Sequence, residues 1–90
     1  MKLVQEIMVR MPHGLHARPA STLVRLLRGC SSKITFKHQD RLANGHSIVE
    51  LLMLAAKTGA TLEVTVEGED ATDVMGIVTT AFDRGLEVTG

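Results

Sequence analysis

Aromatic side chains are scarce in this chain of 90 residues, which has no tryptophan, no tyrosine and only two phenylalanines, Phe36 and Phe82. Its hydrophobic core must therefore be built mainly from aliphatic residues. Proteins that bind single-stranded nucleic acid stack several bases on aromatic rings. Two phenylalanines do not supply such a platform, so we expect a globular protein that does not bind nucleic acid.

Cysteine and long apolar runs are equally scarce. Cys30 is the only cysteine, which excludes an internal disulfide and gives no sign of an oxidising compartment. The longest apolar run, from Leu51 to Ala56, is far shorter than a membrane span, and the first six residues lack the apolar centre of a secretory signal. We therefore expect a cytoplasmic protein with no membrane insertion. Ninety residues suffice for one modest core, so residues 1–90 should form a single domain.

The formal net charge is zero, but the charges are unevenly distributed. Residues 1–46 contain eight of the ten Lys and Arg residues, whereas residues 47–90 contain eight of the ten Asp and Glu residues. A basic half on a neutral protein is better suited to docking on acidic protein surfaces than to gripping a DNA backbone.

The hydrophobic periodicity predicts seven elements. Strands are expected at 2–9, 33–38, 41–44 and 61–67, and helices at 17–28, 47–56 and 70–84. Pro19 fits only the first turn of a helix, so the first helix should begin near His16, and Gly29, Gly59 and Gly85 are expected to end the three helices. Antiparallel strands in this β-α-β-β-α-β-α order, with helices on one face, give an α+β two-layer sandwich.

His16 is the strongest candidate for chemistry. At the start of a helix, the backbone N–H groups of Ala17 and Arg18 have no intrahelical partner and can bind an anion. The Arg18 guanidinium can pair with phosphate oxygens, and an imidazole is a competent nucleophile near neutral pH. The residues alone leave a second interpretation open, in which His16 is a polar helix cap and Arg18 a solvated charge.

The segment Gly-Leu-His-Ala-Arg-Pro-Ala at residues 14–20 resembles the active-site motif of the HPr family, the histidine phosphocarriers of the bacterial phosphotransferase system. Residues 44–48 and 68–70 match the same family. The resemblance implies an open-faced sandwich with a four-stranded antiparallel sheet and three helices on one face. It also implies that His16 accepts a phosphoryl group on Nδ1 from enzyme I and donates it to a IIA-type protein, while Arg18 steadies the group. Such a carrier is not an enzyme and needs no cofactor.

Ser47 supports two interpretations. Serine followed three residues later by Glu50 has the form of a capping box, which is a sufficient structural reason for both residues. The resemblance implies that a serine here can be phosphorylated by an HPr kinase. However, His46 stands where the best-known regulated members have lysine, Val49-Glu50 replaces a Met-Gly pair, and Glu50 would repel a phosphate on Ser47.

The predicted helix at 47–56 has more apolar residues than one buried face can hold. Either the core is generously packed, or Ile48, Val49 and Leu52 form a docking patch near His16, which the resemblance favours. We expect Leu15 and Ser21 to join this patch. The run Leu-Leu-Met-Leu at 51–54 resembles the nitrogen-regulatory branch of the family more than the sugar-transport branch.

The other histidines show no metal-binding spacing, and we expect no metal site. His13 is close enough to His16 in sequence to influence its protonation, whereas His38 and His46 suggest no role. The alternative function is a regulatory binding module whose phosphorylation state selects its partner. Because a carrier must expose His16 to successive partners, we expect a monomer.

Overall fold

The computed structural model describes residues 1–86 and contains seven elements. In chain order these are β1 (Lys2–Met8), α1 (Ala17–Leu26), β2 (Lys33–His38), β3 (Arg41–Asn44), α2 (Ile48–Met53), β4 (Thr61–Glu67) and α3 (Ala71–Asp83). The predicted β-α-β-β-α-β-α order is confirmed. Within the described range, no helix combines the length and the hydrophobicity that crossing a bilayer requires.

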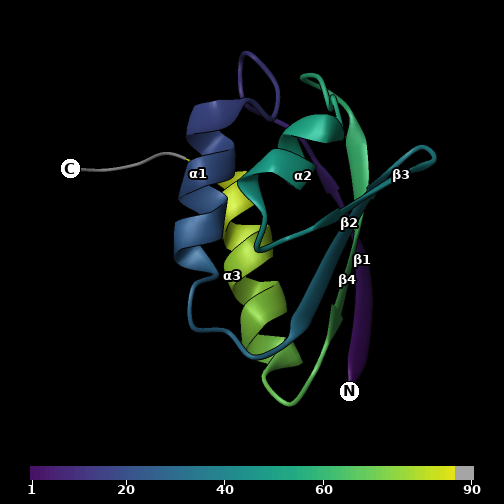
Figure 1. The fold of residues 1–90 in the computed structure, drawn as a ribbon, viewed down its shortest axis with the longest axis vertical. Helices are drawn as coiled ribbons and strands as arrows, with labels where there is room; N and C mark the ends of the chain where they lie inside the picture. Colours follow the sequence, from purple (N-terminus) through teal and green to yellow (C-terminus); the bar gives the residue numbers. More distant parts are fainter. Residues whose placement is uncertain (87–90) are drawn as a thin grey trace.

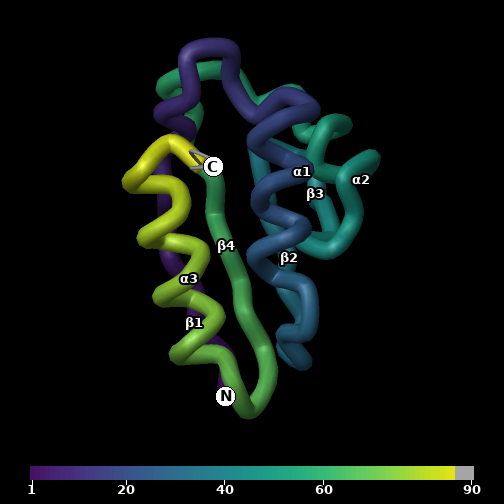
Figure 2. The backbone as a smooth tube through the Cα atoms, turned by 90° about the vertical axis from the view of Figure 1, so that its left-hand side faces the viewer, coloured from purple at the N-terminus to yellow at the C-terminus, as the bar shows by residue number. Residues whose placement is uncertain are grey.

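The four strands form one sheet in the order β1-β4-β2-β3, and every neighbouring pair is antiparallel. The central strand β4 places Val66 opposite both Leu3 of β1 and Ile34 of β2. All three helices lie on one side of this sheet, as Figures 1 and 2 show from two directions. The molecule is therefore the α+β open-faced sandwich that the sequence predicts.

The core lies between the sheet and the helices. Alternation along β4 buries Leu62, Val64 and Val66 completely, as the strict period of two predicts. The two phenylalanines meet in this layer: Phe36 of β2 and Phe82 of α3 are both buried, with ring centroids 5.9 Å apart. The scarce aromatic residues thus join the sheet directly to α3.

The predicted end of the second helix was wrong. The helix does not continue to residue 56 but ends at Met53, with Leu54 as its C-cap. Ala55 then adopts a left-handed backbone conformation with φ of 53°, which carries the chain away from the helix axis. Gly59, which we expected to end this helix, instead belongs to the following turn, where its N–H donates to the carbonyl of Val9 at 2.8 Å.

Smaller differences concern the other ends and one face. The first strand ends at Met8, the first helix at Leu26 and the last helix at Asp83, each one or two residues short of the predicted boundary. The apolar side chain of Ile77 on α3 is 38% exposed, whereas Val74 and Val78 are buried.

Candidate functional site

His16 stands at the N-cap of α1, at the exposed end of the helix. Its backbone is extended, with φ of −95° and ψ of −170°, and its side chain makes no capping hydrogen bond. An N-cap side chain normally accepts a bond from the first turn. The His16 imidazole is not used in this way, so the ring is available to a ligand.

The amide donors beside His16 belong to Ala17 and Arg18, and both residues are exposed. The first N–H that bonds within the helix is that of Ala20, which donates to the carbonyl of His16 at 3.0 Å. Pro19, which lies between Arg18 and Ala20, has no N–H. The amides of Ala17 and Arg18 have no intrahelical acceptor, and together with the helix dipole they favour an anion at this end.

The loop before His16 is fastened to a segment more than 40 residues away. Gly14 donates from its N–H to Met11 O at 3.0 Å and to Thr58 Oγ1 at 3.2 Å, and Leu15 N–H donates to Ala56 O at 2.9 Å. Gly14 has φ of +73°, and a Cβ there would lie only 2.5 Å from the Ala56 oxygen. These contacts hold the chain in the course that brings His16 to the surface. Neither Ala56 nor Thr58 carries a sequence signal for this role.

Two residues expected in the docking patch differ in their placement. Leu15 is only 4% exposed and belongs to the core, so our expectation that its side chain contributes to a docking surface was wrong. The physical reason is the hydrogen bond from its N–H to Ala56, which holds the backbone against the α2–β4 connection. Ser21 is half-buried on α1.

His13 lies beside His16. The two ring centroids are 5.9 Å apart and the ring planes meet at 74°, an edge-on arrangement, and both residues are exposed. His38 and His46 make other contacts: His38 Nδ1 lies 2.9 Å from Leu54 O, and His46 Nε2 lies 3.5 Å from Ser32 O. Among residues 1–86, no three His, Cys, Asp or Glu side chains come together in a group that could hold a metal ion.

Helix α2 packs against α1 (Figure 1). It also presents an apolar surface to solvent. Ile48, Val49 and Leu52 are 38%, 66% and 38% exposed, whereas Leu51 and Leu54 are buried. Met53, which the sequence argument did not include, is as exposed as Val49. The surplus of apolar residues in this segment therefore lies at the surface rather than in an enlarged core.

Ser47 is the N-cap of α2, and its hydroxyl oxygen accepts the N–H of Glu50 at 3.2 Å. The Glu50 carboxylate accepts the N–H of Asn44 at 2.9 Å rather than that of Ser47, so only half of the reciprocal capping box forms. The Ser47 hydroxyl therefore already has a structural role.

Asp70 at the N-cap of α3 joins two parts of the chain. Its carboxylate accepts the N–H of Ser31 at 2.9 Å and the hydroxyl of Ser32. These bonds, with the Ser32 hydroxyl first, hold the pKa of Asp70 below its usual value. Partial burial, and secondarily the Asp70 charge, raise the pKa of the nearby Cys30 thiol. This cluster lies away from His16 and fastens the α1–β2 connection to α3.

Comparison with known proteins finds relatives among phosphocarrier proteins. Residues 3–84 match the family described as "PTS HPr component phosphorylation site". Phosphocarrier protein HPr of Chlamydia muridarum is 35% identical over 79 residues, covering 88% of this chain and 76% of that protein. The multiphosphoryl transfer protein of Salmonella typhimurium is 38% identical over 87 residues, covering 93% of this chain, but the chain spans only 23% of that relative's length. The crystal structure of phosphocarrier protein HPr from Bacillus anthracis is 26% identical and superimposes with a TM-score of 0.84, covering 90% of this chain and 96% of that one.

Proposed function

Because the chain belongs to the HPr family of phosphocarrier proteins, we propose that His16 accepts a phosphoryl group from an enzyme I-type phosphotransferase and donates it to a IIA-type protein. The observation that carries the proposal is the exposed His16 imidazole at the N-cap of α1, which makes no capping bond. We further propose that the protein acts in the cytoplasm, where soluble partners can reach this ring.

The transfer is a substitution at phosphorus. A lone pair on Nδ1 of His16 forms a new N–P bond while the N–P bond to the donor's phosphohistidine breaks, and the donor imidazole leaves with the electron pair. Donation to the IIA-type protein repeats the step with His16 as the leaving group. Because His16 itself is phosphorylated in one step and dephosphorylated in the next, the carrier is a substrate of its partners rather than a catalyst.

Two features beside the ring suit the phosphoryl group. The amides of Ala17 and Arg18 and the positive end of the helix dipole can neutralise its oxygens. The Arg18 guanidinium, which is exposed on the first turn, can add a bidentate contact. A charge-assisted hydrogen bond contributes about 1.5–3 kcal/mol, so the loss of Arg18 should slow transfer by about ten- to a hundredfold.

Partner docking is best assigned to the exposed face of α2. Ile48, Val49 and Leu52 form an apolar surface on a helix that packs against α1. We propose that successive partners place an apolar patch here, with Ser21 of α1 at its edge and acidic groups facing the basic α1. In protein–protein interfaces a few residues carry most of the binding energy.

The decisive experiment mixes the protein with phosphoenolpyruvate and enzyme I and measures acid-labile phosphate. We expect one phosphoryl group in the wild type, none in His16→Ala and slow incorporation in Arg18→Ala. His38→Ala is the matched control, because this histidine lies at another part of the surface and should leave labelling intact. A label that persists in His16→Ala would move the chemistry to another residue and end the proposal.

A further inference from the structure

The outer face of α3 carries a stripe of exposed residues, here called the seam, that does not pack into the hydrophobic core. Asp73, Ile77, Thr80 and Arg84 follow one another at intervals of four, three and four residues, the spacing of a two-helix contact. All four are exposed, whereas the opposite stripe of α3, including Val74, Val78 and Phe82, is buried. Within residues 1–86, this second face of the helix therefore stays exposed.

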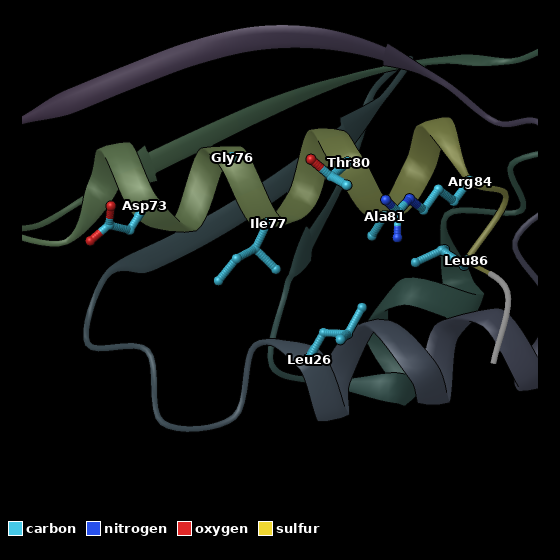
Figure 3. A pocket seen from close by; sticks show the side chains of 8 residues that line it. All are labelled: Leu26, Asp73, Gly76, Ile77, Thr80, Ala81, Arg84 and Leu86. Carbon is cyan, nitrogen blue, oxygen red and sulfur yellow. The ribbon is translucent and has the colours of Figure 1, made fainter. Parts of the chain in front are cut away.

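This face borders an apolar hollow. The hollow lies between α3 and the end of α1, with Leu26 and Ile77 on its two sides, Asp73 at one end and Arg84 at the other (Figure 3). Leu26 is 46% exposed and Ile77 is 38% exposed. Two large aliphatic side chains thus border one groove from different helices, with opposite charges at its ends.

Gly76 lies in the middle of this face, and no contact within the described part of the monomer requires a glycine there. A glycine inside a helix is less favourable than alanine. Its backbone does not require positive φ, and a Cβ there would meet nothing within 4 Å. A second helix packed on this face would explain the glycine, because the absence of a side chain allows the two backbones to come closer together.

The order of residues along the seam is complementary to itself when reversed. If a second α3 lies antiparallel across a two-fold axis midway between Ile77 and Thr80, Asp73 faces Arg84 of the other copy at both ends. Ile77 then faces Thr80, and Gly76 lies beside this contact on the exposed side of the helix. The charged ends lie about 16 Å apart along the helix, and a two-fold contact makes both ion pairs at once.

We propose that the α1–α3 groove binds a second copy of this chain through an antiparallel α3–α3 contact. The helix dipole accounts for an acid near the start and a base near the end of α3. It does not account for their lying on one face with Ile77, Thr80 and Gly76 between them. A monomer was expected only because His16 must stay exposed, and the seam does not include His16. A contact limited to one helix face and one flanking leucine is small, so the association should be weak and concentration-dependent.

Sedimentation velocity tests this between low-micromolar and millimolar protein. The wild type should show a rising average sedimentation coefficient. Asp73→Arg and Arg84→Asp should each weaken association by about tenfold or more, because each replaces two attractions by two repulsions. An equimolar mixture of the two variants should associate again, since each then supplies the charge that the other needs. The double variant with both substitutions should also regain self-association, because its two ion pairs form with the charges reversed.

Gly76→Gln supplies an independent test. Glutamine is the better helix former, so the monomer should fold at least as well, as urea unfolding would measure, while association should weaken. The proposal is overturned if the wild type stays monomeric throughout, even if another protein binds the groove. It is also overturned if the mixture of charge variants fails to associate. Phosphoryl acceptance at His16 is measured separately and should be unchanged in these variants, so the two proposals can fail independently.

Discussion

The ring of His13 stands edge-on to the ring of His16, with centroids 5.9 Å apart and planes at 74°. At this distance an imidazole N–H can reach an oxygen of a phosphoryl group held on His16. We expect His13→Ala to shorten the lifetime of the phosphohistidine by about fivefold, the effect of one hydrogen bond. Phosphorus NMR after removal of the donor would measure the decay.

His13→Asn is the matched variant for this prediction, because its amide retains a donor on a shorter side chain. We expect the lifetime of its phosphohistidine to lie between those of the wild type and His13→Ala. Equal lifetimes in all three proteins would mean that His13 does not touch the phosphoryl group.

The backbone at Gly14 should tolerate no side chain. Gly14→Ala would combine a left-handed φ of +73° with a Cβ 2.5 Å from the Ala56 oxygen, and we expect a loss of roughly 2–4 kcal/mol in the free energy of unfolding. Gly29→Ala is the control, since φ is +90° there but nothing lies within 4 Å of the added carbon. It should cost about 1–2 kcal/mol. Similar losses in urea unfolding would contradict the steric argument.

Asp70 should make stability depend on acid pH. The Ser32 hydroxyl and the Ser31 N–H lower its pKa in the folded state, whereas the unfolded value is about 3.9. Folding then favours the ionised form, so this stabilisation is present above about pH 4 and is lost as the pH falls through the lower, folded pKa. The urea midpoint of the wild type should therefore fall with acidification in this window.

In Asp70→Asn, we expect lower stability at neutral pH and a flatter decline in acid. Glu69→Gln, at the neighbouring exposed position, should keep the wild-type slope. An unchanged slope in Asp70→Asn would assign the acid sensitivity to other carboxyl groups.

The role of Ser47 as a helix cap predicts a measurable loss of stability. Removing its hydroxyl in Ser47→Ala leaves the N–H of Glu50 without its acceptor and should cost about 1 kcal/mol. Ser47→Asn retains an acceptor, and its free energy of unfolding should lie within a few tenths of a kcal/mol of the wild-type value. If both variants unfold at the wild-type urea concentration, the cap contributes nothing and only a regulatory role would remain for this serine.

Much of the fold could be predicted because it depends on local patterns. The period of two in β4 and the apolar spacing of α1 reflect which face each element buries, and Pro19 fixed the start of α1 near His16. The end of α2 could not be predicted, because Ala55 adopts a left-handed conformation that alanine rarely chooses. Contacts with the rest of the molecule determine that conformation.

The sequence by itself determined the chemistry of the site: an imidazole, free amides and a guanidinium within three residues, His16 to Arg18, because one helix start brings them together. The tertiary structure decided what surrounds them. Only folding could bring Ala56 and Thr58 to the loop of Gly14, bury Leu15, turn the ring of His13 toward His16 and leave the seam of α3 uncovered. These relationships join residues that are distant in the chain or depend on side-chain direction, and no local periodicity encodes them.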